Sequence, residues 1–380
     1  MKVAFFYNAQ YHQILHSLPF AFELSIRHPE IEVHILAPTK AHIAYIQALE
    51  PLYPGAKVTY RRLRLPLPVR LYRAVHKAVV PPKLPTLLNN LALFDEYDAL
   101  VVTEKTSLLM KHFGVARPLF VHTAHGAGDR ATAVDRRIRE FDYALVPGPK
   151  TAKWLLELGH VTPGRYTVGA YAKFDIVRRM AKARAPLFDN GRPTVLYNPH
   201  FRPSLSSWPE WGTRVLDWFA EQDRYNLVLA PHIRLFDPPT LARYREFERW
   251  QGLPHIRIDL GSEASVDMTY TMGADLYMGD VSSQVYEFLV EPRPCLFLDS
   301  HGADWRGNPR YKFWTLGPVL GDIDRLEEGL AAAFAEQPAH LPLQRAAVAE
   351  TFDMETTVPD TVDALAGFLL RQVARMREPA

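Results

Sequence analysis

The feature that most constrains this chain is an alternation of short apolar, β-rich runs with stretches of helical periodicity. The first series contains the runs KVAFFYN, EVHILAP, KVTYRRL, DALVVTE, PLFVHTA, YALVPG and RYTVGA. Strands separated by crossover-length segments are typical of parallel βαβ units. Between the first two runs, Ile14, Leu18, Phe22 and Ile26 recur near helical spacing, which predicts the first crossover helix.

A break in this alternation predicts a domain boundary. Residues 181–193, AKARAPLFDNGRP, combine proline, glycine, asparagine and charge without a period. The alternation then restarts with TVLYN, YNLVLA, HIRID, ADLYMG and PCLFLD. Because 380 residues exceed one ordinary core, we predict two doubly wound α/β domains, Rossmann-like, over 1–185 and 190–380. They should face a central cleft, and a helix over 355–377 should close the second domain.

The cysteine content and the hydropathy indicate in which cellular compartment the protein works. Cys295, the only cysteine, lies inside PCLFLD, so neither a disulfide framework nor a thiolate metal site is available within one chain. The N-terminal apolar stretch is shorter than a signal-peptide core and reads as a first strand. No run approaches the ~20 apolar residues of a membrane span. We therefore expect a cytoplasmic protein whose membrane contact, if any, is at its surface.

A cationic segment stands out against a formal net charge of only +2. No acidic residue occurs from Pro51 to Phe94, and leucines interleave with the cations. A solvated charged face is one reading. The other is a surface for anionic lipid, on the inner face of the cell membrane, or for a polyanionic acceptor; nucleic acid is not expected. For the second reading we single out Arg61, Arg62, Arg64, Arg70, Arg73 and Lys77, with Lys57 and Lys83 completing the segment.

Histidines gather where predicted strands end. In open parallel sheets, ligands bind beyond the carboxyl ends of the strands. A single histidine there is usually solvated or structural, but several at one edge favour a site. Five occur at such positions: His122, His125, His200, His232 and His301.

The segment VHTAHGAGD, residues 121–129, is the strongest case. Gly126 and Gly128 allow a close backbone approach or positive φ, and His125 could take a proton from an attacking hydroxyl. The alternative is a glycine-rich turn with packed histidines. The His122–His125 spacing has no third ligand in view, so no metal site is predicted.

The segment MGDVSSQVYEFLVEP, residues 278–292, predicts a phosphate site. Asp280, Ser282 and Ser283 precede a short helix whose core face would be Val285, Phe288 and Leu289. Helix capping is the alternative, but free amides at a helix start also favour anions. The Walker and dinucleotide glycine patterns are both absent, so NAD chemistry has no support.

Two near-repeats, NPHFR at 198–202 and APHIR at 230–234, each close a predicted strand. Arg202 and Arg234 would present planar cations to phosphate oxygens, and His200 and His232 could donate hydrogen bonds or protons. A chance echo of four residues is the alternative.

Together these segments resemble a known family. The ordered series HTAHG, LYNPHFR, LVLAPHIR, ADLYMGDVSSQVYEFL, PCLFLD and FWTLGPV is similar to the CDP-glycerol glycerophosphotransferases, the teichoic-acid primases and polymerases of GT-B fold. The resemblance runs from about His122 to Val319; the first 115 residues match only as a generic acceptor domain.

The resemblance implies roles for single residues. His125 would act as base on the acceptor hydroxyl, and His232 would hold the transferring phosphoryl group. The remaining matches would bind the donor or its phosphates: Gly126, Arg202, Asp280, Ser282, Ser283 and, one turn later, Glu287; His200 and Arg234 join them on position alone. The chain departs from the family's pattern at His200, at His232-Ile233 and at Gly279-Asp280-Val281.

The implied reaction is attack of an acceptor hydroxyl on the distal phosphorus of a CDP-activated alcohol, with release of CMP. The acceptor would be a polyol phosphate, a glycan or a lipid-linked chain, in synthesis of a cell-envelope polymer such as teichoic acid or capsule. No obligatory cofactor is implied, with Mg²⁺ as the alternative. Rival hypotheses are a GT-B glycosyltransferase, a UDP-sugar 2-epimerase, and a nucleotide-binding scaffold without chemistry.

Overall fold

The computed structural model describes residues 1–8, 11–76, 80–127, 134–181 and 185–377, without the side chains of His12, Arg73, Val75 and His76. The chain divides into two compact units. Of the described residues, those up to 127, 134–181 and 350–377 form the first unit, and 185–349 form the second.

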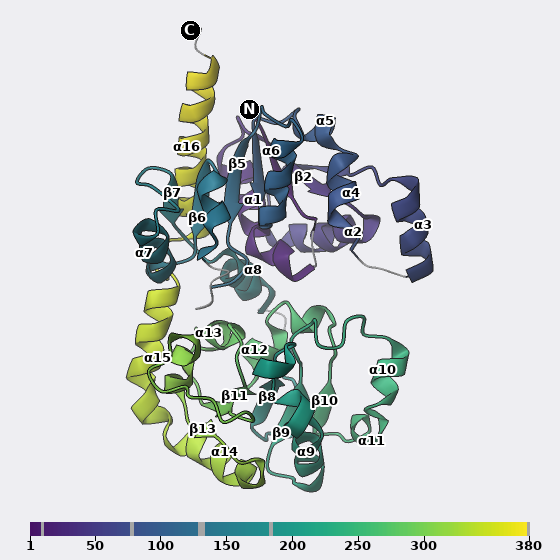
Figure 1. The fold of residues 1–380 in the computed structure, drawn as a ribbon, viewed down its shortest axis with the longest axis vertical. Coiled ribbons are helices and arrows are strands. Elements are labelled where there is room, and N and C mark those ends of the chain that lie inside the picture. Colours follow the sequence, from purple (N-terminus) through teal and green to yellow (C-terminus); the bar gives the residue numbers. More distant parts are fainter. Residues whose placement is uncertain (9–10, 77–79, 128–133, 182–184, 378–380) are drawn as a thin grey trace. The chain divides into compact units, whose positions relative to one another are not determined.

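The first unit is built on seven parallel strands (Figure 1). They are β1 (Lys2–Phe6), β2 (Glu32–Ala37), β3 (Val58–Arg62), β4 (Ala99–Val102), β5 (Leu119–Thr123), β6 (Tyr143–Val146) and β7 (Tyr166–Val168). Its helices are α1 (Leu18–Arg27), α2 (Lys40–Leu49), α3 (Leu67–His76), α4 (Lys83–Leu88), α5 (Leu91–Phe94), α6 (Leu109–His112), α7 (Pro149–Glu157), α8 (Ala172–Ala181) and α16 (Val358–Arg377), with 3-10 turns η1 (Tyr11–His16), η2 (Glu50–Leu52), η3 (Lys105–Leu108) and η5 (Arg136–Glu140).

The second unit is built on six parallel strands. They are β8 (Thr194–Asn198), β9 (Asn226–Leu229), β10 (Ile256–Ile258), β11 (Leu276–Gly279), β12 (Cys295–Leu298) and β13 (Val319–Leu320). Its helices are α9 (Trp208–Glu221), α10 (Leu241–Arg245), α11 (Glu248–Gln251), α12 (Thr269–Gly273), α13 (Gln284–Phe288), α14 (Leu326–Ala335) and α15 (Gln337–Thr351), whose last residues join the first unit, with 3-10 turns η6 (Pro203–Leu205), η7 (Glu263–Ser265), η8 (Pro309–Leu316) and η9 (Ile323–Arg325).

Both sheets are doubly wound, as expected. The strand orders are β3-β2-β1-β4-β5-β6-β7 and β10-β9-β8-β11-β12-β13. Each order reverses direction once, between β1 and β4 and between β8 and β11. Ligands of doubly wound sheets bind at such switch points, beyond the carboxyl ends of the strands. All twelve predicted strands are confirmed; β13, two residues long, was not predicted.

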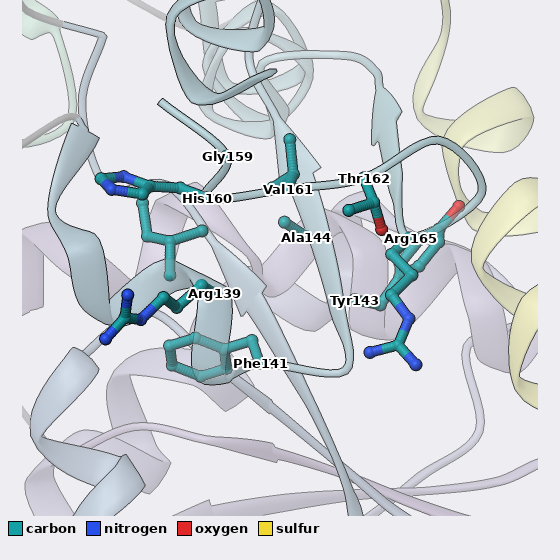
Figure 2. A pocket seen from close by; sticks show the side chains of 10 residues that line it. Arg139, Phe141, Tyr143, Ala144, Gly159, His160, Val161, Thr162 and Arg165 are labelled. Carbon is teal, nitrogen blue, oxygen red and sulfur yellow. The ribbon is translucent and has the colours of Figure 1, made fainter. Parts of the chain in front are cut away.

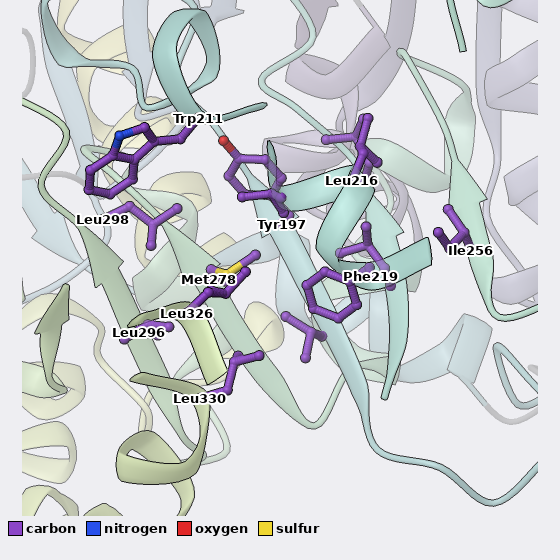
Figure 3. Close-up of a cluster of buried hydrophobic side chains, with 14 of the residues drawn as sticks. Tyr197, Trp211, Leu216, Phe219, Ile256, Met278, Leu296, Leu298, Leu326 and Leu330 are labelled. Atoms are coloured by element: carbon purple, nitrogen blue, oxygen red, sulfur yellow. The ribbon is translucent and has the colours of Figure 1, made fainter. Parts of the chain in front are cut away.

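Continuous burial explains why these runs form central parallel strands. Residues of β4, β9, β11 and β12 are buried throughout, as expected when helices cover both faces of a sheet. In the second unit, Figure 3 shows Leu216 and Phe219 of α9 packing toward Tyr197 of β8 and Met278 of β11. This packing holds the ends of β8 and β11 in fixed register, and that register positions the loops that follow them.

The last helix corrects the sequence-based division. We expected residues 355–377 to close the second domain, but α16 belongs to the first unit. It packs along α1 and β7, Phe368 stacks on Tyr143 with ring centroids 4.1 Å apart, and Asp363 binds Arg27. The apolar stripe predicted a buried helix correctly, but a stripe does not specify which core receives it.

Candidate active site

The two Pro-His-x-Arg segments are one local structure used twice. They follow β8 and β9, which pair directly. In the first, the Arg202 amide donates to Nδ1 of His200 at 3.1 Å; in the second, the Arg234 amide donates to Nδ1 of His232 at 3.2 Å. Because Nδ1 accepts in both, neutral rings carry their proton on Nε2. Each turn therefore fixes the tautomer of its histidine.

The two histidines differ in exposure. His200 is fully buried, whereas His232 is half-buried. Phe201 packs against both, with its ring centroid 4.5 Å from that of His200 and 4.6 Å from that of His232, and the two histidine rings lie 5.5 Å apart. The exposed guanidinium of Arg234 lies 4.3 Å from the centroid of Phe201. The turns thus present His232 and two arginines at the surface of the unit and keep His200 inside.

Asp280 anchors the loop after β8. Its side chain is 2% exposed and accepts hydrogen bonds from the amides of His200 (2.8 Å), Ser207 (2.6 Å) and Val281 (2.8 Å) and from the Ser207 hydroxyl (3.0 Å). Burial raises the pKa of Asp280 to about 6, although these donors act in the opposite direction. With both oxygens occupied by loop donors, the carboxylate braces the first Pro-His-x-Arg turn.

Two further contacts hold the same loop. Nε2 of His301, after β12, lies 3.1 Å from the carbonyl of Ser206, and the Trp314 indole donates to the carbonyl of Asp280 at 3.0 Å. Since a carbonyl only accepts, Nε2 of His301 carries the proton here. His301 was predicted at a strand end. It lies there, and its hydrogen bond stabilises the loop after β8.

The serine segment reaches its predicted position. Ser282 is buried and Ser283 half-buried directly after β11, and α13 begins at Gln284. The Gln284 amide donates to the Ser282 hydroxyl at 3.3 Å. Val285, Phe288 and Leu289 form the buried face, as predicted, and Glu287 is buried.

His125 lies in the first unit, after β5. Its Nδ1 lies 2.9 Å from the Thr103 carbonyl, so Nδ1 carries the proton and the neutral ring has its lone pair on Nε2. Burial lowers the pKa of His125, while Glu104 and the Thr103 carbonyl act in the opposite direction. Gly126 adopts φ +145°, a value that favours glycine; Gly128 lies outside the described residues. His125 is therefore held as a neutral imidazole at neutral pH.

A polar network that sequence reasoning missed includes Thr103, the hydrogen-bond partner of His125. Glu104, one residue beyond Thr103, forms an ion pair with Lys83 at 2.8 Å and accepts a hydrogen bond from Gln13. The Thr103 hydroxyl donates to Gln13 at 3.1 Å. Burial acts to raise the pKa of Glu104, but Lys83 and Gln13 outweigh it and lower the pKa. The strand-end rule that selected the histidines applies equally to Glu104 and could have found it.

His122 is a buried companion. It is 5% exposed, its ring packs 5.0 Å from that of Phe141, and its Nε2 has no hydrogen-bond partner within the described structure. Burial lowers its pKa well below the ordinary value. His122 is therefore a neutral residue of the core beneath His125.

The cationic segment separates into paired and exposed parts. Arg61 binds Glu96 at 2.8 Å and Tyr97 at 3.2 Å, and Lys83 belongs to the network above. Arg62, Arg64 and Arg70 are exposed. The Arg73 side chain and all of Lys77 lie outside the described residues.

Exposed apolar side chains accompany these cations. On α3, Leu67, Leu71 and Tyr72 are 63%, 59% and 48% exposed, while Val69 is buried. No described helix is long and apolar enough to cross a membrane. Within the described residues, no group of three or more His, Cys, Asp or Glu is placed to hold a metal ion.

Comparison with known proteins identifies the fold. No family model matches the sequence, and no curated protein matches it. A putative UDP-N-acetylglucosamine 2-epimerase from Listeria monocytogenes aligns with TM-score 0.65 at 13% identity, over 100% of this chain and 98% of its own. The wall teichoic acid polymerase TagF aligns with TM-score 0.61 at 14% identity, over 100% and 90%. The UDP-GlcNAc 2-epimerase from Neisseria meningitidis, bound to UDP-GlcNAc, aligns with TM-score 0.59 at 12% identity, over 98% and 100%.

These similarities confirm the expected fold class, two doubly wound domains of the GT-B type. The neighbours are enzymes of two kinds, a polymerase and epimerases. At such identities they show the fold and leave the reaction to be argued from the site.

Proposed function

We propose that the protein transfers a glycerol-phosphate or related polyol-phosphate unit from a CDP-activated donor to an acceptor hydroxyl, releasing CMP. The observation that carries this is the hydrogen bond from Nδ1 of His125 to the Thr103 carbonyl. It leaves the Nε2 lone pair to take the proton of an attacking hydroxyl. A base held in this tautomer at a strand end suits a reaction with a nucleophilic acceptor.

In this proposal the second unit binds the donor. His232 contacts the transferring phosphoryl group, and Arg202 and Arg234 neutralise phosphate oxygens through planar, charge-assisted hydrogen bonds. Ser282 and Ser283 donate to the phosphates beside the start of α13. Asp280 and His200 act through the loop that they hold, since a buried carboxylate saturated with donors does not suit contact with a phosphate. We assign the buried Glu287 to the same donor side.

Positioning and charge neutralisation supply the acceleration, as in phosphoryl transfer generally. The bond from the acceptor oxygen to the distal phosphorus forms, the bond to the CMP oxygen breaks, and the acceptor proton passes to His125. We propose no obligatory metal; Mg²⁺ dependence is tested by repeating the assay with EDTA and with added Mg²⁺.

A UDP-sugar 2-epimerase is the second candidate, because whole-chain alignment to epimerases favours it. An epimerase needs no acceptor, so it gives no reason for an exposed cationic helix. Incubation with CDP-glycerol, CDP-ribitol and UDP-sugars separates the two. CMP that appears only when an acceptor is present supports transfer; a UDP-sugar converted without any acceptor supports epimerisation.

We further propose that the protein works on the cytoplasmic face of a membrane through α3. Exposed Leu67, Leu71 and Tyr72 beside the exposed Arg70 suit an interfacial helix on anionic lipid. Co-sedimentation with phosphatidylglycerol vesicles should fall for Leu67→Ser/Leu71→Ser. The control is Leu241→Ser, a leucine 81% exposed in the second unit. Equal sedimentation of both variants and the parent would leave only a solvated charged face.

A further inference from the structure

A cavity of about 660 Å³ in the first unit is lined largely by cations. Its wall combines the segment after β4 with the turn η5. The lining includes three arginines, one lysine and two carboxylates among its ten residues. This volume falls within the range of roughly 300–1,000 Å³ that is typical of small-molecule sites.

Two of the cations that line this cavity, Arg136 and Arg139, are not paired with any neighbouring carboxylate that the structure describes. Asp135 is already paired with Arg137. The Arg137 Nε donates to the two carboxylate oxygens of Asp135 at 3.0 and 3.2 Å, and the Arg137 Nη2 donates to one of them as well. Arg136 and Arg139 are exposed, and within the described part of the chain neither makes an ion pair or a hydrogen bond through its side chain. Two arginines that line the cavity therefore have no ion-pair partner within the described residues.

The cavity adjoins the network of the proposed base. Lys105, which lines it, directly follows Glu104, and its charge lowers the pKa of both His122 and His125. Burial lowers the pKa of Lys105 itself. Partial burial raises the cost of keeping Lys105 charged, and a dianionic ligand placed beside Lys105 and the two exposed arginines would lower that cost.

We propose that this cavity binds a phosphate group of the acceptor, held by Lys105, Arg136 and Arg139. The assignment to the acceptor rests on the proposed function, since His125 in the same unit takes the proton of the acceptor hydroxyl. The ligand class is therefore a hydroxyl compound with a phosphate ester, such as a polyol phosphate or the terminal unit of a polyol-phosphate chain.

A second cavity, of about 100 Å³, is a useful contrast. It lies at the amino ends of β6 and β7 and is lined by Arg139, His160 and Arg165. In Figure 2 the guanidinium groups of Arg139 and Arg165 point away from each other. Arg165 lines only this small cavity, so it provides a charge-matched control.

The test uses the full chain in two measurements. Isothermal titration with glycerol 1-phosphate, without any donor, compares the parent, Arg136→Ser/Arg139→Ser and the control Lys153→Ser/Arg165→Ser, in which Lys153 is exposed on α7. We expect Kd to rise at least tenfold, about 1.4 kcal/mol, in the first variant and to stay unchanged in the control. Unchanged Kd in the cavity variant, or an absence of binding by the parent, would overturn the proposal.

The second measurement is the transfer assay. The cavity variant should raise KM for the phosphorylated acceptor and leave KM for the donor unchanged, whereas a donor-side role would raise KM for the donor. Failure of the proposed function appears as no CMP from any donor, and the titration still decides the anion site in that case. Because both arginines are exposed, unchanged thermal unfolding is expected and excludes misfolding.

Discussion

Replacing Asp280 with Asn separates the stability of the second unit from the geometry of its site. The carboxylate accepts from the amides of His200, Ser207 and Val281 and from the Ser207 hydroxyl. Asn keeps one acceptor oxygen and turns an NH₂ toward the Ser207 amide, 2.6 Å from the original oxygen. An NH₂ that faces another donor leaves a buried donor unsatisfied, which costs about 1–3 kcal/mol.

The loss is offset by relief of burial. A pKa of about 6 in place of 3.8 means that ionisation of Asp280 at pH 7 costs the folded state about 3 kcal/mol. The two effects nearly cancel, so Asp280→Asn should change the free energy of unfolding by less than about 2 kcal/mol at pH 7. Activity should fall more, since a displacement of about 1 Å in a site costs on the order of 100-fold.

The pH dependence has a definite sign. Because the folded-state pKa of Asp280 is raised, its contribution to stability is present at low pH and is lost as pH rises through about 6. The variant lacks this contribution, so its free energy of unfolding relative to that of the parent should fall by about 1 kcal/mol from pH 7 to pH 5. Urea unfolding followed by tryptophan fluorescence reports this directly, since six of the seven tryptophans lie in residues 183–349. Full activity in a folded variant, or a relative stability of the variant that rises from pH 7 to pH 5, would contradict this prediction.

Two further predictions concern the histidines. His200→Ala should lower the free energy of unfolding by about 2–4 kcal/mol, because it empties a fully buried site. His232→Ala should leave the free energy of unfolding nearly unchanged and reduce the rate of transfer more. The reverse ranking, in parallel urea-unfolding and rate measurements, would exclude this difference between the two histidines. Glu104→Gln should move the acid limb of the kcat/KM profile to lower pH, because Glu104 stabilises the protonated form of His125. Glu104→Asp should show a smaller shift. An acid limb that does not move would exclude Glu104 as a positioning residue.

Much of the fold could be predicted because parallel strands are short, buried and regularly spaced. The runs around Val195 and Leu227 predicted adjacent strands and placed both Pro-His-x-Arg segments at one edge, as found. The placement of the last helix could not be predicted, because Leu365 and Phe368 show which face is buried but not against what. Contacts such as Phe368 with Tyr143 join residues more than two hundred positions apart.

The site was predictable in its positions more than in its roles. Position after a strand identified His125 and His232, but burial separates His232 from His200, and burial is set by packing. In the sequence, the charge of Asp280 suggested a residue that contacts the ligand. The four hydrogen-bond donors to its carboxylate show instead that it stabilises the loop after β8. The exposed pair Arg136 and Arg139 follows no strand, so the strand-end rule passed over it.

The most direct test of the central claim is the identity of the nucleotide released. The full chain is incubated with CDP-glycerol, CDP-ribitol and UDP-sugars, with and without a polyol-phosphate acceptor, and compared with His125→Ala. We predict acceptor-dependent release of CMP from a CDP-alcohol, and we predict that His125→Ala abolishes this release while CDP-alcohol binding persists. Release of UDP, conversion of a UDP-sugar without acceptor, or near-normal turnover in His125→Ala would contradict these predictions.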